Sequence, residues 1–352
     1  MVSKRNKVFV ALSGGIDSST AAALLLQAGF DCAGVFMITS NHAQSAQANA
    51  EVVAGKLGIE LHTLDLRKEF DLILDYFCSE YRKGRTPNPC VFCNRHIKFG
   101  KLWDFARDNG ADMLATGHYA RILRVNNQVG LYEAANPTKD QSYALSMINK
   151  DRLTRIILPL GDHSKDQARK LASRFGLGTE QSKESQEICF IPNDDYVSVL
   201  EQRCPELARR GKIVDSSGKV LGEHNGVHRF TIGQRRGLRV AMGKPYYVVK
   251  IDAESNTVTL GPKEEVMHSK LSATGANWLT SEPKSPFRAT VKIRYNDSGV
   301  AARVSPQSNG VIVEFDEPNL AITPGQLAVF YIQEGNGNRV AGSAWIDKVI
   351  NQ

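Results

Sequence analysis

Long apolar runs are absent from this chain of 352 residues. No stretch approaches the ~20 consecutive apolar residues that a membrane-spanning helix needs. The charged residues before position 8 precede a short apolar segment that ends in a glycine loop, which favours a strand over a signal peptide. Internal repeats, low-complexity tracts and coiled-coil heptads are missing too. We therefore expect a cytoplasmic, monomeric protein with no membrane partner and with two or three domains.

Two common phosphate-binding motifs are also absent. Without G-x-x-x-x-G-K-[ST] no lysine is placed to reach terminal phosphates, and without G-x-G-x-x-G a dinucleotide site is disfavoured. Instead, Ser13-Gly14-Gly15-Ile16-Asp17-Ser18-Ser19 directly follows the apolar run 8–12. Paired glycines let backbone N–H groups converge, and a helix starting there would add its N-terminal dipole. The pattern predicts an anion cradle for a phosphate group, and a plain glycine turn is the alternative.

Cysteine is scarce, with six in the chain, and we expect no structural disulfide framework. Cys90 and Cys93 form a C-x-x-C in a stretch where Pro87 and Pro89 predict extended backbone rather than helix. A helix cap at or near Asn94 would place Cys93 at a helix start, which lowers the pKa of a thiol. A second C-x-x-C or C-x-x-H, which a zinc site needs, is missing. The alternatives are a nucleophilic or persulfide-carrying thiol, half a zinc site, or inert packing.

The other cysteines lie in different surroundings. Cys189 is far along the chain from the C-x-x-C, in the segment 187–192. Cys32, Cys78 and Cys204 have apolar or helical neighbours, and we interpret them as packing residues.

The net charge of +7 is unevenly distributed, at +2 for residues 1–204 and +5 for residues 205–352. An excess of this size fits contact with a polyanion, but a solvated basic surface explains it nearly as well.

Short apolar strands alternate with helical segments up to about residue 120. We expect strands at Val8–Leu12, Cys32–Met37, Ile59–Leu64 and Met113–Thr116, and helices at Ser19–Ala28, Gln44–Leu57, Phe70–Arg82 and Ile97–Asp108. This alternation predicts the α/β class, with a Rossmann-like parallel sheet and the phosphate loop after its first strand.

Beyond residue 120 the pattern changes. Residues 120–135 predict a polar hairpin, and Asp151–Phe175 predicts helix with one break. After about residue 205 short β-rich runs alternate with turns, which predicts a small β domain followed by a C-terminal β-barrel or sandwich. We expect a catalytic domain over 1–204, a central β domain over 205–266 and a C-terminal β domain over 267–352.

The string S-G-G-x-D-S resembles the pyrophosphatase loop of ATP-dependent adenylating enzymes, which holds the departing pyrophosphate. Further blocks, in the same order over nearly the whole chain, resemble the bacterial tRNA-uridine 2-sulfurtransferases. These blocks are Arg85–Pro89, Cys93-Asn94 with Ile97–Phe99, Ala115–Tyr119, Lys139–Tyr143, Ile188–Ile191 and Thr323–Gln326. The resemblance implies an adenine nucleotide α-hydrolase-like fold and a C-terminal β-barrel that contacts tRNA.

The resemblance also implies an activity and its residues. The C2 oxygen of the wobble uridine would be adenylated with ATP and Mg²⁺, and sulfur would then displace AMP. Cys93 matches the nucleophile and Cys189 the persulfide carrier, supplied by a sulfur-donor protein or sulfide. Nucleotide-binding positions would be Ala11, Leu12, Ser13, Gly14, Gly15, Ile16, Asp17, Ser18, Met37 and Gly117. The tRNA-contacting positions would be Asn88, Pro89, Cys90, His118, Lys139, Asp140, Gln141, Arg294, Tyr295 and Gln326.

The residues alone leave simpler interpretations open for several of these positions. Lys139 and Arg294 could be surface charges, Met37 and Tyr295 could be core, and His118 could be a structural histidine.

Cys90 departs from the resembled family, whose best-known members have an aspartate there that is assigned to acid–base work. The departure leaves three cysteines: Cys90, Cys93 and Cys189. A related group of tRNA sulfurtransferases holds a [4Fe–4S] cluster with three thiolates and one open iron. Both a persulfide route, with Cys90 auxiliary, and a cluster route, with all three cysteines as ligands, therefore remain open. Acidic residues that many members of the resembled family have are missing from the segment 38–42, and Asn49 stands where an aspartate would be expected. The nucleotide or Mg²⁺ contacts that those acidic residues would make are therefore not expected here.

Two other function classes compete with this interpretation. A different adenylating enzyme, such as an amidotransferase-coupled ligase, would not require Cys93 and Cys189. A non-enzymatic RNA-binding module would not require the loop Ser13–Ser19.

Overall fold

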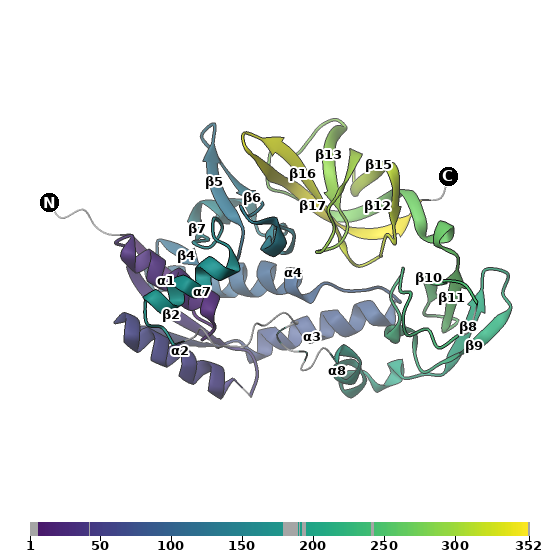
Figure 1. Ribbon diagram of the computed structural model, residues 1–352, viewed down its shortest axis with the longest axis horizontal. Coiled ribbons are helices and arrows are strands. Elements are labelled where there is room, and N and C mark those ends of the chain that lie inside the picture. Colours follow the sequence, from purple (N-terminus) through teal and green to yellow (C-terminus); the bar gives the residue numbers. More distant parts are fainter. Residues whose placement is uncertain are drawn as a thin grey trace. The chain divides into compact units, whose positions relative to one another are not determined.

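The computed structural model describes residues 6–41, 43–178, 189, 191, 195–240 and 243–350 (Figure 1). The chain forms two compact units, and each is built from separate chain segments. The first unit comprises Met1–Leu72, Cys90–Glu184 and Gln333–Ala341, and the second comprises Ile73–Pro89, Ser185–Ile332 and Gly342–Gln352. No helix in the described part of the chain has the length and apolar character needed to span a membrane.

A five-stranded sheet is the centre of the first unit. Its order is β3-β2-β1-β4-β7 and all of its pairings are parallel. The strands are β1 (Lys7–Ala11), β2 (Asp31–Ile38), β3 (Leu61–Asp65), β4 (Met113–Ala115) and β7 (Ile156–Ile157). Val8, Phe9 and Val10 in β1 are fully buried, as expected for a central parallel strand that is covered on both faces.

Helices connect and cover these strands. They are α1 (Ile16–Gln27), α2 (Gln44–Leu57), α3 (Arg67–Arg82), α4 (Pro89–Cys93), a π-helix (Asn94–Lys101), α5 (Leu102–Asp108), α6 (Ser142–Leu145), α7 (Lys165–Arg174) and α8 (Tyr196–Arg203). Helix α1 packs against α7, and Ala21 of α1 and Ala168 of α7 belong to the same buried cluster. The expected α/β class and parallel sheet are confirmed.

Two expectations about local structure were wrong. Helix α4 begins at Pro89, before the expected cap at Asn94, because proline is well suited to the first position of a helix, where no N–H partner is needed. Residues 151–175 are not one broken helix: a 3₁₀-helix (Lys150–Arg155) and the two-residue strand β7 precede α7. Strand β7 pairs with β4 and extends the sheet at its edge.

The expected hairpin is present as β5 (Arg121–Val125) and β6 (Gln128–Tyr132). Asn126 and Asn127 form its turn with positive φ angles of 48° and 60°, as a tight two-residue hairpin turn requires. The first unit also includes the start of β17, where Arg339 pairs with Tyr132 and forms an ion pair with Glu334 at 3.0 Å.

The second unit contains two β structures. The smaller is a four-stranded sheet of order β10-β11-β8-β9, made of β8 (Gly211–Asp215), β9 (Val220–His224), β10 (Tyr247–Asp252) and β11 (Thr257–Gly261). The larger has the antiparallel order β12-β15-β14-β13-β16-β17 and is closed into a barrel by pairing of β12 with β17. Its strands are β12 (Met267–Trp278), β13 (Phe287–Lys292), β14 (Val300–Gln307), β15 (Gly310–Leu320), β16 (Leu327–Glu334) and β17 (Gly337–Val349). The expected C-terminal β-barrel is confirmed.

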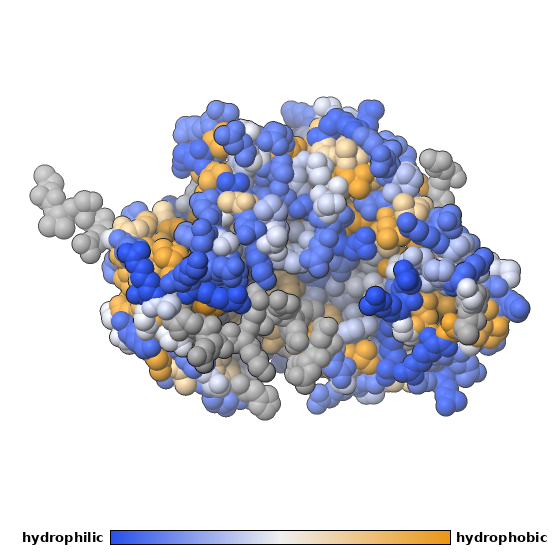
Figure 2. Space-filling view, viewed as in Figure 1, coloured by the Kyte–Doolittle hydropathy of each residue, from blue (hydrophilic) through white to orange (hydrophobic). Residues whose placement is uncertain are grey.

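Hydrophilic residues predominate on the face shown in Figure 2, and the hydrophobic ones form separate patches. Among the described residues, the exposed large hydrophobic side chains are single residues on different elements: Val52, Leu72, Val220 and Tyr295. Scattered residues of this kind are normal on a protein surface and indicate no docking face.

Candidate functional site

The loop between β1 and α1 forms an open helix N-terminus. Gly15 is the cap residue of α1, and no side chain in the described part of the chain caps the helix. Gly14 has a φ of +75°, in the left-handed region that glycine adopts without strain. The first N–H groups of a helix have no partner within the helix and carry its positive partial charge. This end of α1 can therefore bind an anion.

Serine hydroxyls hold the loop in shape. The Ser13 N–H donates to Ser18 Oγ at 3.1 Å, and the two hydroxyls lie 3.1 Å apart. The Ser18 and Ser19 hydroxyls both donate to the Gly15 carbonyl, at 3.1 and 2.8 Å. The loop is therefore pre-organised by its own side chains.

Close backbone approach explains two of the glycines. A Cβ at Gly14 would lie 2.6 Å from the Ala46 carbonyl oxygen and 2.8 Å from Cβ of Asn49, both on α2. A Cβ at Gly117, just after β4, would lie 2.7 Å from the Ser18 nitrogen. Because β2, β1 and β4 are adjacent, the carboxyl ends of these strands bring Met37, the loop and Gly117 to one edge of the sheet. Ligands of open parallel sheets bind at this edge.

Not every expected nucleotide position offers its side chain. Leu12 is 2% exposed and Ile16 is 6% exposed, and both belong to hydrophobic clusters. Ala11 ends β1, so these three residues can offer only backbone groups to a ligand. Met37 is half-buried near the end of β2.

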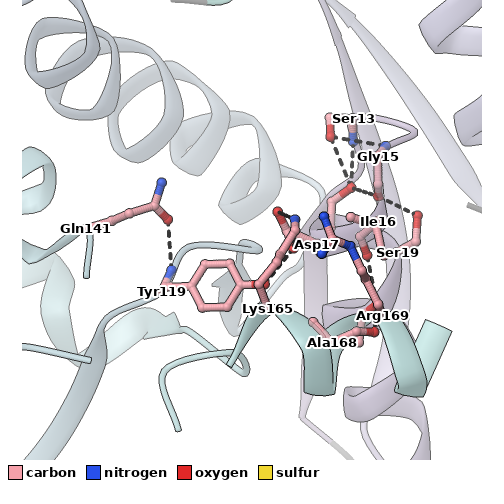
Figure 3. A network of polar contacts seen from close by, with 12 residues as sticks. Ser13, Gly15, Ile16, Asp17, Ser19, Tyr119, Gln141, Lys165, Ala168 and Arg169 are labelled. Carbon is pink, nitrogen blue, oxygen red and sulfur yellow. Dashed lines mark hydrogen bonds and ion pairs between the residues drawn. The ribbon is translucent and has the colours of Figure 1, made fainter. Parts of the chain in front are cut away.

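Asp17, in the first turn of α1, is held by two residues that the sequence analysis did not identify (Figure 3). Nζ of Lys165 lies 2.7 Å from both of its carboxylate oxygens, and the Tyr119 hydroxyl donates to Oδ1 at 2.7 Å. Lys165 is itself only 8% exposed. This network links the first turns of α1 and α7 to the segment after β4. The Lys165 ammonium group balances the charge of the Asp17 carboxylate.

The backbone of Tyr119 continues the network. Its N–H donates to Oε1 of Gln141 at 2.9 Å, and its carbonyl accepts from the Gln141 N–H at 2.7 Å. Asp140 accepts from the Ala134 N–H at 2.8 Å and from the Ser142 hydroxyl at 2.7 Å, while burial raises its pKa. In the expected tRNA-contacting segment 139–141, the Asp140 and Gln141 side chains therefore make hydrogen bonds within the protein. Neither Tyr119 nor Lys165 could have been found from spacing, because both are more than 100 residues from Asp17.

His118 occupies the position of a structural histidine. Its Nδ1 lies 2.7 Å from Oγ1 of Thr116, and its Nε2 lies 3.4 Å from Nζ of Lys98. A lysine can only donate, so Nε2 accepts, and Nδ1 carries the proton and donates to Thr116. Burial, with a smaller contribution from the Lys98 charge, lowers the pKa of His118 well below its usual value. The neutral ring positions Lys98 on the π-helix.

The cysteines separate into buried and accessible groups, and all six are thiols rather than disulfides. Cys32, Cys78 and Cys204 are buried, as the packing interpretation predicts. Cys90 is exposed and Cys93 is half-buried, three residues apart in α4 and so on one face of the helix. Cys189 is exposed in the second unit, while its neighbours Ile188 and Phe190 lie outside the described residues, as does His42.

The π-helix begins immediately after Cys93, and short π-helical segments are frequent at functional sites. Its first residue, Asn94, is 3% exposed and donates to the Ala144 carbonyl at 3.0 Å, while its buried Oδ1 has no hydrogen-bond partner among the described residues. A buried acceptor of this kind costs free energy unless something satisfies it. Sequence spacing alone did not indicate this atom.

The remaining expected tRNA contacts lie in the second unit. The Gln326 side chain donates to the carbonyls of Thr86 and Pro87, and Asn88 Nδ2 approaches its Oε1 at 3.4 Å. Arg294 donates to the Leu320 carbonyl at 3.0 Å, and the adjacent Tyr295 is 44% exposed in the turn after β13.

Comparisons with known proteins identify the family. Family models match residues 6–193 (tRNA methyl transferase HUP domain), 198–262 (tRNA methyl transferase PRC-barrel domain) and 268–346 (Aminomethyltransferase beta-barrel domain). A tRNA-specific 2-thiouridylase MnmA from Pelobacter propionicus is 48% identical over 92% of this chain and 94% of its own. The MnmA of Syntrophotalea carbinolica is 44% identical over 98% of this chain and 100% of its own. A solved NMN synthetase from Francisella tularensis aligns at a TM-score of 0.34, covering 51% of this chain and 66% of its own, which is too weak to add to the assignment. At this level of identity over nearly the full length, the chain belongs to the tRNA-specific 2-thiouridylase MnmA family of sulfurtransferase enzymes.

Proposed function

We propose that this protein uses ATP to exchange the C2 oxygen of the tRNA wobble uridine for sulfur, acting as a monomer in the cytoplasm. The observation that carries the proposal is the open N-terminus of α1 beside the glycine loop, in a chain that belongs to the MnmA family. A carbonyl oxygen is a poor leaving group, so it must first be activated. Adenylation does this: the uridine oxygen attacks the α-phosphorus of ATP, and pyrophosphate leaves.

The loop suits the pyrophosphate part of this step. Backbone N–H groups of Gly14 to Asp17 supply donors at a helix N-terminus, while the Ser18 hydroxyl, which donates to the Gly15 carbonyl, keeps the loop in shape. Mg²⁺ would neutralise phosphate charge. The Asp17 carboxylate is paired with Lys165 and is therefore not a free ligand for this ion. Mg²⁺ commonly keeps several waters and binds through substrate phosphates, so we derive no step from a protein ligand to it.

Sulfur transfer would use two thiols. A persulfide on Cys189 holds an outer sulfur, and the Cys93 thiolate attacks the inner sulfur. The released sulfide attacks C2 of the adenylated uridine, and AMP leaves with the original oxygen. A Cys93–Cys189 disulfide remains, and a reducing thiol must open it before the next turnover.

The cluster route is the alternative that Cys90 suggests. Cys90 and Cys93 supply two thiols on one helical turn. The third expected ligand, Cys189, belongs to the other unit. We derive no step through an iron–sulfur cluster. Cys90, Asn88 and Pro89 would then act beside the target base, and Lys139, Arg294 and Tyr295 would contact the tRNA.

The experiment is in vitro thiolation of tRNA with ATP and a persulfide donor, followed by mass spectrometry of the wobble nucleoside. Wild type should form 2-thiouridine with one AMP per product, and Cys93→Ser and Cys189→Ser should form none. Cys32→Ala, which changes a buried thiol far from these motifs, should remain active. Full activity of both site variants would overturn the proposal and favour another adenylating enzyme.

The same preparation separates the two sulfur routes. Protein purified without oxygen should be colourless, free of iron and fully active. Iron and sulfide that disappear in Cys90→Ala, together with activity, would overturn the persulfide route in favour of the cluster.

A further inference from the structure

A pocket in the second unit is lined by none of the residues assigned so far. Its volume is about 530 Å³, and it is formed by the segment that precedes β10 and by β11. Two of its lining residues, Leu238 and Leu260, are buried in the hydrophobic cluster of the four-stranded sheet, so the pocket is part of a packed domain. The rest of the lining includes Arg235, Arg239, Lys244 and Tyr246.

The charged residues that line this pocket all have the same sign. Between Glu223 and Asp252 the sequence has no acidic residue, and it has six basic ones: Arg229, Arg235, Arg236, Arg239, Lys244 and Lys250. Three of these six line the pocket. A concave surface that is lined by one sign of charge concentrates ions of the opposite sign.

The three cations in the pocket are also unpaired within the described residues. Elsewhere in the second unit, exposed arginines pair with carboxylates, as Arg82 does with Glu206 and Arg288 with Asp316. Neither an ion pair nor a side-chain hydrogen bond joins Arg235, Arg239 or Lys244 to another described residue. Lys244 instead lies over the ring of Tyr246, with Nζ 5.7 Å from the centroid.

Arg239 has a φ of +55°, a left-handed conformation in which glycine or asparagine is usual. The chain therefore has a guanidinium group where a smaller residue would fit the backbone better. Arginine binds phosphate through two parallel hydrogen bonds, and lysine adds a point charge.

We propose that this pocket binds phosphate groups of the tRNA backbone. The inference rests on the proposed function, because it assumes that tRNA is the substrate. It adds a contact region in the central β domain, made of residues other than Lys139, Arg294 and Tyr295. Such contacts position an RNA without reading its sequence, so the pocket contributes affinity rather than choice of base.

The test compares two double variants that remove the same charge. Arg235→Gln with Arg239→Asn removes two of the three cations that line the pocket, and asparagine tolerates the left-handed backbone at 239. Lys212→Gln with Lys219→Gln neutralises two exposed lysines of the same domain outside the pocket. Melting temperatures establish that both variants fold. Binding of labelled tRNA is then measured over a series of salt concentrations, with thiolation kinetics alongside.

The pocket variant should bind tRNA about three- to tenfold more weakly per lost contact at low salt, and its salt slope should fall by about 1 per contact. Its KM for tRNA should rise while kcat at saturating tRNA is retained. Inorganic phosphate should compete with tRNA in wild type and less so in the variant.

Three results would overturn the inference. They are tRNA affinity equal to wild type, an equal loss in the Lys212/Lys219 control, and phosphate binding at the pocket without any change in tRNA affinity. A wild-type protein that neither binds nor thiolates tRNA would instead refute the proposed function itself.

Discussion

The side-chain nitrogen of Gln326 donates to the carbonyl oxygen of Thr86 at 3.0 Å, across 240 residues of sequence. The same nitrogen donates to the Pro87 carbonyl at 3.0 Å, and the Thr86 N–H donates to the Pro324 carbonyl at 2.9 Å. At Gly325, with φ +92°, a Cβ would lie only 2.7 Å from the Thr86 oxygen. The turn before β16 therefore holds the segment that leads directly into α4, which contains Cys90 and Cys93. This makes Gln326 a positioning residue for that segment.

The first prediction concerns this contact. Gln326→Ala leaves the carbonyls of half-buried Thr86 and buried Pro87 without this donor and should lower the free energy of unfolding by about 1–2 kcal/mol. Because the start of α4 loses its support, the kcat for thiolation should fall while tRNA binding is retained. Both are measured by urea unfolding and by single-turnover thiolation at saturating tRNA.

Gln307→Ala is the matched control, since Gln307 is an exposed glutamine of the same barrel. It should leave both stability and kcat unchanged. If Gln326→Ala instead weakens tRNA binding and keeps kcat at saturation, Gln326 contacts the tRNA and is not a positioning residue.

A second prediction uses the unequal burial of Asp17 and Lys165. The Lys165 side chain is 9% exposed and that of Asp17 is 33% exposed. Asp17→Asn leaves a buried ammonium unpaired and should cost about 3 kcal/mol, whereas Lys165→Met leaves a partly hydrated carboxylate and should cost about 1 kcal/mol. Urea unfolding midpoints show which of the two variants is less stable. ATP binding should weaken in both variants because the ion pair that links α1 to α7 is lost. Equal costs would show that the carboxylate, too, is effectively desolvated.

The parallel sheet and the loop after β1 could be predicted from sequence because both depend on local patterns. Apolar strands alternate with amphipathic helices, and Gly14 and Gly15 mark the turn. The same local reasoning failed at Pro89, where two prolines indicated extended backbone. Proline is compatible with the first turn of a helix, so whether it excludes or begins a helix depends on the residues that follow.

Long-range partners could not be predicted. Asp17 pairs with Lys165 across 148 residues, and Gln326 with Thr86 across 240. Nothing in either local sequence encodes these contacts, because they arise only when separate helices and strands pack. Strand β7 was missed for a related reason: two residues show no periodicity, and only their pairing with β4 makes them a strand.

A third prediction follows from the lowered pKa of His118. In the unfolded chain this ring takes up a proton near pH 6.5, but in the folded protein it stays neutral to lower pH. The contribution of neutral His118 is thus fully present above pH 6.5 and is lost as the pH falls, by up to about 1.4 kcal/mol per pH unit. His118→Gln should reduce the loss of stability between pH 7 and pH 5, measured by urea unfolding. The residual dependence comes from His96, His224, His228 and His268, whose pKa values are also lowered by burial. An unchanged pH profile in the variant would contradict the neutral assignment.

The last prediction concerns the order in which thiols react. Burial raises the pKa of Cys32 to about 11 and that of Cys78 to about 12, so near pH 7.5 few of these thiols are ionised, and neither is accessible. Because the thiolate is the reactive form, both should resist iodoacetamide in the native protein. Cys90 and Cys189 are exposed and should be alkylated first, with half-buried Cys93 next.

Mass spectrometry of peptides after timed alkylation gives the order directly. Repeating it in 6 M guanidinium, where every thiol is accessible, should equalise the rates and so provides the control. Early labelling of Cys32 or Cys78 in native protein would contradict their burial. Because Cys189 is labelled before Cys93, thiolation should be lost in step with Cys189 labelling. Activity that survives full labelling of Cys93 would exclude it as the nucleophile.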